Sequence, residues 1–177
     1  MQNREQFLTL VREALESIRE PRFYVTERGF QGELLTELRN RLDGAELPGE
    51  PIVEQEYQKT LPLHGVNFRP DIIVHIPFER GCAKRRDQGN FVAMELKLRA
   101  TENEANADFA KLVQMRKALG YPLTIFINVD SDETHAAQRP AAVADETVCF
   151  AVQLEHGNAV VRMASPALKN VGGQSPQ

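Results

Sequence analysis

Three charged residues stand inside or beside apolar runs whose pattern predicts buried β-strands. Asp71 directly precedes the run Ile-Ile-Val-His-Ile at 72–76, and Glu95 and Lys97 interrupt the run that begins at Phe91. An ionised side chain in such a strand is unfavourable unless it is paired, hydrogen-bonded or bound to a metal ion. The three residues therefore need a common explanation.

Strand geometry can bring these charges together. Side chains two positions apart lie on one face of a strand, so Glu95 and Lys97 point to the same side. If the two strands are neighbours, Asp71 lies near Glu95, and two carboxylates meet beside an ammonium group. Carboxylates held close together repel each other unless a cation lies between them, and such oxygen ligands favour Mg²⁺ or Mn²⁺ over zinc. The spacing therefore predicts a magnesium site.

The pattern Pro70-Asp71 followed by Glu95-x-Lys97 resembles the PD-(D/E)xK nuclease superfamily, also called the restriction endonuclease-like fold. The order of elements over about residues 28–130 also resembles that family, with a glutamate-bearing helix and a strand before Pro70, and a helix and a strand after Lys97. The resemblance implies an α/β fold, a mixed β-sheet flanked by helices in the order α-β-β-β-α-β. It also implies a metal-dependent endonuclease or phosphodiesterase, a hydrolase that acts on nucleic acid, DNA rather than RNA.

The resemblance assigns metal ligands to individual residues. Asp71 and Glu95 would ligate Mg²⁺, or Mn²⁺ in its place, and the backbone carbonyl of Leu96 would be a further ligand. Glu33 on the preceding helix would complete the site or hold a second ion. Glu37, one helical turn later, competes with Glu33 for this role.

Basic residues complete the site that the resemblance implies. Lys97 would stand beside the attacking water or the scissile phosphate, either as an ammonium group or as a base with a lowered pKa. The candidates for contacts with nucleic-acid phosphates are Arg80, Lys84, Arg85, Arg86 and Lys111. Two alternatives stay open: the loop cluster is simply solvated, or Lys111 forms a local i,i+3 pair with Asp108.

Two other interpretations fit the same three residues. One is a catalytically silent nuclease-like module that binds nucleic acid or a partner protein. The other is a structural or interaction domain in which Asp71, Glu95 and Lys97 form an ordinary ion-pair network of little energetic value. For a nuclease that cuts both strands of a duplex, two active sites are needed, which favours a homodimer through the N-terminal helix or the C-terminal hairpin.

Composition limits the class of protein. With 177 residues and 42% hydrophobic content, the chain fits one domain over residues 1–164, followed by a flexible tail at 165–177. The two cysteines, Cys82 and Cys149, form no CxxC pair, so neither a disulfide framework nor a zinc site is expected. A net charge of −4 argues against a protein that coats nucleic acid through bulk charge. No apolar stretch approaches the roughly 20 residues that span a bilayer, so we expect a cytoplasmic protein without membrane contact.

The elements that must position the charged residues follow from hydrophobic periodicity. Helical spacing predicts helices over about 3–20, 27–42 and 102–119. Strands are expected over 52–59, 72–76, 91–98 and 123–129, the last parallel to the Glu95 strand through a helical crossover. The segments 147–154 and 159–163 flank a turn at Glu155-His156-Gly157-Asn158 and predict a hairpin that extends the sheet or packs beside it.

Overall fold

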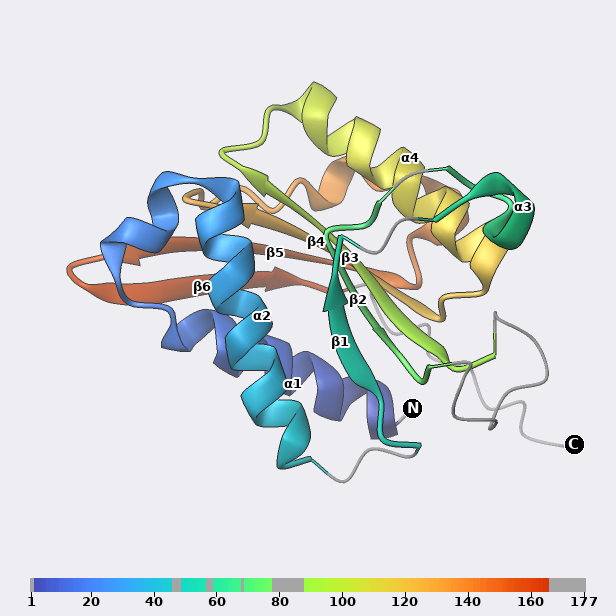
Figure 1. The fold of residues 1–177 in the computed structure, drawn as a ribbon. Helices are drawn as coiled ribbons and strands as arrows, with labels where there is room; N and C mark the ends of the chain where they lie inside the picture. Colours follow the sequence, from blue (N-terminus) through green and yellow to red (C-terminus); the bar gives the residue numbers. More distant parts are fainter. Residues whose placement is uncertain (1, 46–48, 57–58, 68, 78–87, 166–177) are drawn as a thin grey trace, which may run out of the picture.

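A six-stranded mixed β-sheet with helices on both faces organises the protein (Figure 1). The computed structural model describes residues 2–45, 49–56, 59–67, 69–77 and 88–165. The strands follow one another in sequence order across the sheet: β1 (Ile52–Gln55), β2 (Ile72–His75), β3 (Asn90–Leu98), β4 (Leu123–Val129), β5 (Thr147–Glu155) and β6 (Asn158–Ala164). Strands β3, β4 and β5 are parallel, whereas β1–β2, β2–β3 and β5–β6 are antiparallel pairs. The predicted α/β fold with a mixed sheet flanked by helices is confirmed at this level.

Helices cover the sheet unequally. On one face lie α1 (Gln2–Ser17) and α2 (Glu27–Asp43), and on the other lies α4 (Glu102–Leu119), which connects β3 to β4 (Figure 1). The shorter helical segments are α3 (Leu61–His64), η1 (Pro21–Val25), η3 (Ala136–Gln138) and η4 (Ala141–Val143). Every residue of β4 is buried, as expected for a parallel strand that is covered on both faces.

The alternation of β3 divides its side chains between two cores. Met94 and Leu96 pack into the larger core with α1 and α2, while Ala93 belongs to the smaller core under α4. By the same alternation Glu95 faces α4, where Phe109 and Phe126 pack with ring centroids 5.1 Å apart. The carboxylate of Glu95 thus points into the smaller core rather than into water.

Local sequence signals fix the helix ends. The hydroxyl of Thr26 accepts a hydrogen bond from the N–H of Gly29 and begins α2. Thr101 and Glu104 form a capping box at the start of α4. Gly120 ends this helix in the left-handed conformation, with φ of 67°. These caps hold the two helices that flank the charged part of β3.

Several predicted boundaries differ from the structure. β1 ends at Gln55 instead of 59 because Glu56 adopts a positive φ of 47°, which breaks the extended conformation. The N-terminal helix ends at Ser17, and Pro21 begins η1. The predicted hairpin is confirmed and extends the sheet, with positive φ at His156 and Gly157 as a tight two-residue turn requires. α3 was not predicted, and all of the predicted tail except residue 165 lies outside the described residues.

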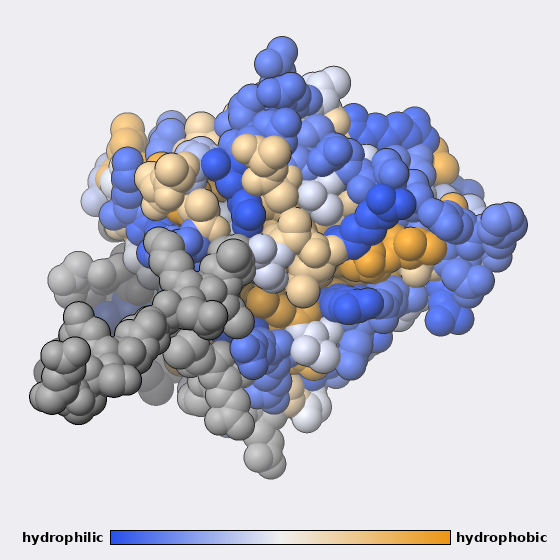
Figure 2. Space-filling view, turned by 180° about the vertical axis from the view of Figure 1, so that it is seen from behind, coloured by the Kyte–Doolittle hydropathy of each residue, from blue (hydrophilic) through white to orange (hydrophobic). Residues whose placement is uncertain are grey.

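The described surface is mainly polar. Figure 2 shows hydrophilic side chains over most of the face that Figure 1 hides, with hydrophobic residues reaching the surface near its middle. Among the described residues, the large hydrophobic side chains that are exposed are Val25, Leu61 and Met163, which belong to three different elements. None of the helices in the described ranges has the length and apolar composition to cross a membrane.

Two glycine substitutions test this account of the helices. A Cβ at Gly32, inside α2, would meet no atom within 4 Å, so Gly32→Ala should raise the free energy of unfolding by about 0.5–1 kcal/mol. The surroundings of Gly120 are equally open, but its φ is +67°, so Gly120→Ala should lower that free energy by about 1 kcal/mol. Urea unfolding measures both changes. A loss of stability in Gly32→Ala would mean that another group approaches this helix closely.

Candidate active site

The charged residues gather where β3 extends beyond its neighbour β2. The described pairing of these strands starts at Ile72 and Met94, and β3 continues to Leu98 without β2 beside it. Two carboxylates take the place of the missing strand. Oδ2 of Asp71 accepts a hydrogen bond from the backbone N–H of Leu96 at 2.7 Å, and Oε2 of Glu27 accepts one from that of Leu98 at 3.3 Å.

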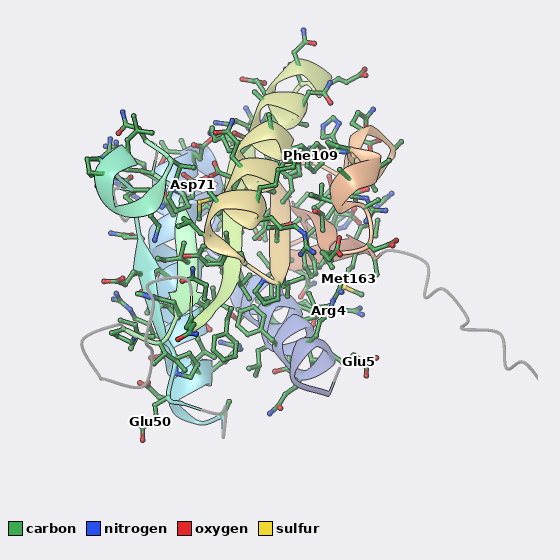
Figure 3. The ribbon with its side chains drawn as sticks, turned by 90° about the vertical axis from the view of Figure 1, so that its right-hand side faces the viewer. Arg4, Glu5, Glu50, Asp71, Phe109 and Met163 are labelled. Carbon is green, nitrogen blue, oxygen red and sulfur yellow. The ribbon has the colours of Figure 1, made fainter. Side chains whose placement is uncertain are left out.

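The backbone around Asp71 is fixed from two sides. Its carbonyl oxygen accepts hydrogen bonds from the side-chain amide of Gln31 at 2.7 Å and from the N–H of Glu56 at 3.0 Å. Figure 3 shows Asp71 at the opposite end of the β1–β2 pair from Glu50. Burial raises the pKa of Asp71 to about 6, against the lowering effect of the Leu96 N–H. Asp71 is therefore held rigidly, in a place where its negative charge is unfavourable.

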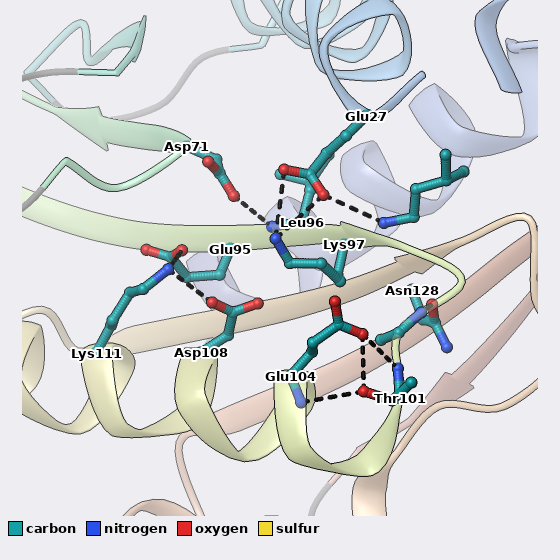
Figure 4. Close-up of polar contacts among 12 residues, drawn as sticks. Glu27, Asp71, Glu95, Leu96, Lys97, Thr101, Glu104, Asp108, Lys111 and Asn128 are labelled. Atoms are coloured by element: carbon teal, nitrogen blue, oxygen red, sulfur yellow. Dashed lines mark hydrogen bonds and ion pairs between the residues drawn. The ribbon is translucent and has the colours of Figure 1, made fainter. Parts of the chain in front are cut away.

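Glu95 is the most deeply buried acid of the site, with 1% of its surface exposed. Its Oε2 accepts a hydrogen bond from Nζ of Lys111 on α4 at 3.1 Å, and Lys111 also donates to Oδ1 of Asp108 at 2.7 Å (Figure 4). Asp108 is buried as well, with 2% of its surface exposed. Among the described residues, no hydrogen-bond partner reaches Oε1 of Glu95 or Oδ2 of Asp108. One oxygen of each buried carboxyl group is thus without a hydrogen-bond partner in this part of the chain.

Opposing charges set the protonation of this cluster. Burial, and secondly the Asp71 carboxylate, raise the pKa of Glu95 to about 8 despite the ammonium of Lys111. Burial alone would lower the pKa of Lys111, but the carboxylates of Glu95 and Asp108 outweigh burial and raise it. Lys111 is therefore a permanent cation beside a carboxyl group that is easily protonated.

Lys97 interacts with Glu27, which lies at the start of α2. Its Nζ is 3.2 Å from Oε2 and 3.5 Å from Oε1 of Glu27 (Figure 4). Burial lowers the pKa of Lys97, but the Glu27 carboxylate outweighs this effect, and the pKa is raised above its ordinary value. Lys97 is thus an ammonium group at neutral pH.

The glutamate that reaches the site from α2 is Glu27, and neither Glu33 nor Glu37 is brought to it. Gln31 faces Asp71, and Glu27 lies one turn earlier on the same helix face. Glu33 is two residues after Gln31, about 200° around the helix, so it points away from that face. Glu37 accepts hydrogen bonds from Ser17 and Arg41 instead. Helix α2 therefore brings Glu27 to the cluster, and the role expected of Glu33 or Glu37 as a metal ligand stays a prediction.

The sequence held a signal for Glu27 and Gln31 that the helical pattern alone did not reveal. With Leu34 and Leu38 they occupy positions i, i+4, i+7 and i+11, so two polar side chains lie in the stripe that faces the sheet. The buried Leu34 and Leu38 confirm which face this is. A polar residue in such a stripe needs a partner, and here the partners are backbone groups at the β2–β3 edge.

The predicted phosphate-binding residues divide into two groups. Arg80, Lys84, Arg85 and Arg86 lie outside the described residues. The predicted i,i+3 pair of Lys111 with Asp108 is present, and the same ammonium also reaches Glu95. Lys111 is thus part of the charged cluster rather than a free surface cation.

The donor set agrees with a hard divalent cation. In the described part of the chain, no group of three or more His, Cys, Asp or Glu side chains is arranged to hold a metal ion. A site made of Asp71, Glu95 and one backbone carbonyl has only two such side chains, however, and Oε1 of Glu95 has no hydrogen-bond partner among these residues. In an extended strand the N–H and C=O of one residue face the same edge, so the carbonyl of Leu96 faces the side of Asp71.

Comparison with known proteins finds no matching family model, no matching curated protein and no matching solved structure.

The raised pKa of Glu95 predicts a loss of stability as the pH rises. The carboxyl group keeps its proton up to about pH 8 in the folded protein, against an ordinary value of 4.5. The folded state therefore binds more protons across this window, and the free energy of unfolding falls by up to about 1.4 kcal/mol per pH unit. Asp71 adds to the fall below about pH 6. Glu95→Gln should remove most of the fall between pH 6 and 8, measured by urea unfolding in EDTA.

A matched control is Glu102→Gln, which changes an exposed acid in the first turn of α4. This variant should keep the pH dependence of the wild type. An unchanged slope in Glu95→Gln between pH 6 and 8 would show that Glu95 is already ionised in the folded protein.

Proposed function

We propose that this chain is a magnesium-dependent nuclease that hydrolyses phosphodiester bonds in nucleic acid, DNA rather than RNA, through a PD-(D/E)xK site in a restriction endonuclease-like core. One observation carries the proposal. Where β3 extends beyond β2, the carboxylates of Asp71 and Glu95 lie with the ammonium of Lys97; Asp71 directly precedes β2, Glu95 and Lys97 belong to β3, and this order is that of the motif. The strand order and the α4 crossover support the same assignment.

Asp71, Glu95 and the carbonyl oxygen of Leu96 are the groups that would hold Mg²⁺, or Mn²⁺ in its place. When bound, the ion supplies a water molecule of lowered pKa and offsets negative charge on the phosphate. The chain fixes these ligands before binding, because the backbone of Asp71 is held by Gln31 and Glu95 pairs with Phe126 of β4. Such preorganisation places ligands and substrate without reordering the chain.

Lys97 would donate hydrogen bonds to the scissile phosphate or to the attacking water. Its raised pKa favours the ammonium form, so its role is to stabilise negative charge in the transition state rather than to accept a proton. Glu27 is a positioning residue for Lys97, because its carboxylate lies within 3.2 Å of the ammonium and is itself tied to the N–H of Leu98.

Exposed arginines around the same edge support binding of a polyanion. Arg28 follows Glu27, Arg69 lies two residues before Asp71, and Arg99 lies two residues after Lys97. Their side chains are 82%, 54% and 66% exposed, and each forms an ion pair with a surface carboxylate, Glu56 or Asp130. Surface ion pairs of this kind are weak, so the guanidinium groups can exchange them for phosphates. These arginines place positive groups beside the site even though the whole chain has a net charge of −4.

Cleavage assays test the proposal. We expect the wild type to cut supercoiled plasmid or labelled single-stranded DNA in Mg²⁺ or Mn²⁺ and to be inactive in EDTA, with labelled RNA as the comparison substrate. Lys97→Ala should lower the cleavage rate at least about a hundredfold, since it removes a charge from the transition state, while its metal affinity changes little. Asp71→Ala should lose both cleavage and metal binding, measured by calorimetry.

Each result has a defined meaning. Normal metal-dependent cleavage by either purified variant would disprove the assignment of the site. A wild type that binds metal but cuts no substrate would indicate the alternative, a nuclease-like module that binds nucleic acid or a partner protein.

The two glutamates of α2 provide a second test. Glu27→Ala frees Lys97 and leaves the N–H of Leu98 without its acceptor, so the cleavage rate should fall at least about tenfold. Glu33→Ala, on another face of the same helix, should cut at the rate of the wild type. The reverse ranking of these two variants in the plasmid assay would restore Glu33 as the functional acid.

A further inference from the structure

The ammonium of Lys111 lies between two buried carboxylates on the α4 side of the site. Its Nζ is 3.1 Å from Oε2 of Glu95 and 2.7 Å from Oδ1 of Asp108. The two acids are 1% and 2% exposed, so water cannot solvate a negative charge on either of them. A cation between two carboxylates is the arrangement in which a second metal ion would be bound, and here the chain supplies that cation itself.

Resting on the nuclease function proposed above, we infer that Lys111 takes the place of a second metal ion, so the site binds a single divalent cation. The formal charges support this inference. With Glu95 ionised, as a carboxylate that ligates a metal must be, the site joins the carboxylates of Glu27, Asp71, Glu95 and Asp108 to the ammonium groups of Lys97 and Lys111, which leaves a formal charge of −2. One divalent ion neutralises the cluster, whereas a second would create an excess of positive charge in a buried place.

The contacts of the two Glu95 oxygens indicate which of them would bind the single ion. Lys111 uses Oε2 of Glu95 and Oδ1 of Asp108, while Oε1 of Glu95 has no hydrogen-bond partner among the described residues. Glu95 thus turns one oxygen to the internal cation and keeps the other for the ion that it would share with Asp71. The side chain of Lys111 is 40% exposed, so a shorter side chain there would open the Glu95–Asp108 pair to solvent and to hydrated ions.

Counting bound Mn²⁺ tests the inference without reference to activity. Calorimetry, with Mn²⁺ electron paramagnetic resonance as a second count, should give one ion per chain for the wild type. Lys111→Ala should bind two, because the ammonium no longer lies between the carboxylates. Lys117→Ala, an exposed lysine on the same helix, is the control and should bind one.

Lys111→Gln is a second variant, needed in case Lys111→Ala does not fold. Its neutral amide still donates to the carboxylates, so the fold is preserved while the charge is lost, and a second ion should bind. Two ions in the wild type, or one ion in a folded Lys111→Ala or Lys111→Gln, would overturn the inference and leave the nuclease proposal intact. Failure of the wild type to bind any divalent ion would instead contradict the proposed function, and this inference with it.

Discussion

A carboxylate buried in the middle of a β-sheet is the constraint on which this structure depends. Glu95 is 1% exposed in a strand whose neighbours are apolar, and leaving its charge unpaired there would cost several kcal/mol. Two features lower this cost: the ammonium of Lys111 on α4 lies beside the carboxyl group, and the raised pKa of about 8 keeps that group protonated at neutral pH. Burial of this kind is unfavourable for folding, which is why strongly shifted carboxyl groups are concentrated at functional sites.

The short length of β2 leaves the backbone of β3 without a partner strand on that side, next to the buried charge. If β2 began several residues before Ile72, its backbone would pair with the N–H groups of Leu96 and Leu98. Carboxylates of Asp71 and Glu27 accept from these groups instead, so an edge that would otherwise invite another strand is closed by side chains. Gln31 donates a hydrogen bond to the carbonyl of Asp71 and so positions α2, which carries Glu27, against the sheet. Helix α4 covers the opposite face of the sheet. Sheet edge, helix start and crossover helix therefore form one unit.

Sequence patterns predicted the parts of this unit that depend on local periodicity. Strand alternation placed Glu95 and Lys97 on one side, and the apolar run after Asp71 placed that residue next to them; the antiparallel β2–β3 pair agrees. The identity of the α2 glutamate did not follow, because Glu27 and Gln31 lie in an apolar stripe and act through backbone groups of distant strands. The contact of Lys111 with Glu95 also depends on how α4 lies across the sheet, which hydrophobic spacing does not specify.

The central claim is that a divalent ion binds between Asp71 and Glu95, and its most direct test is anomalous diffraction from crystals grown with Mn²⁺. Our account predicts a peak within coordination distance of both carboxylates, at roughly 2.0–2.3 Å, with the carbonyl oxygen of Leu96 as a further ligand. No peak at this position in a protein that is saturated with Mn²⁺ in solution, or a peak held by other residues, would contradict it.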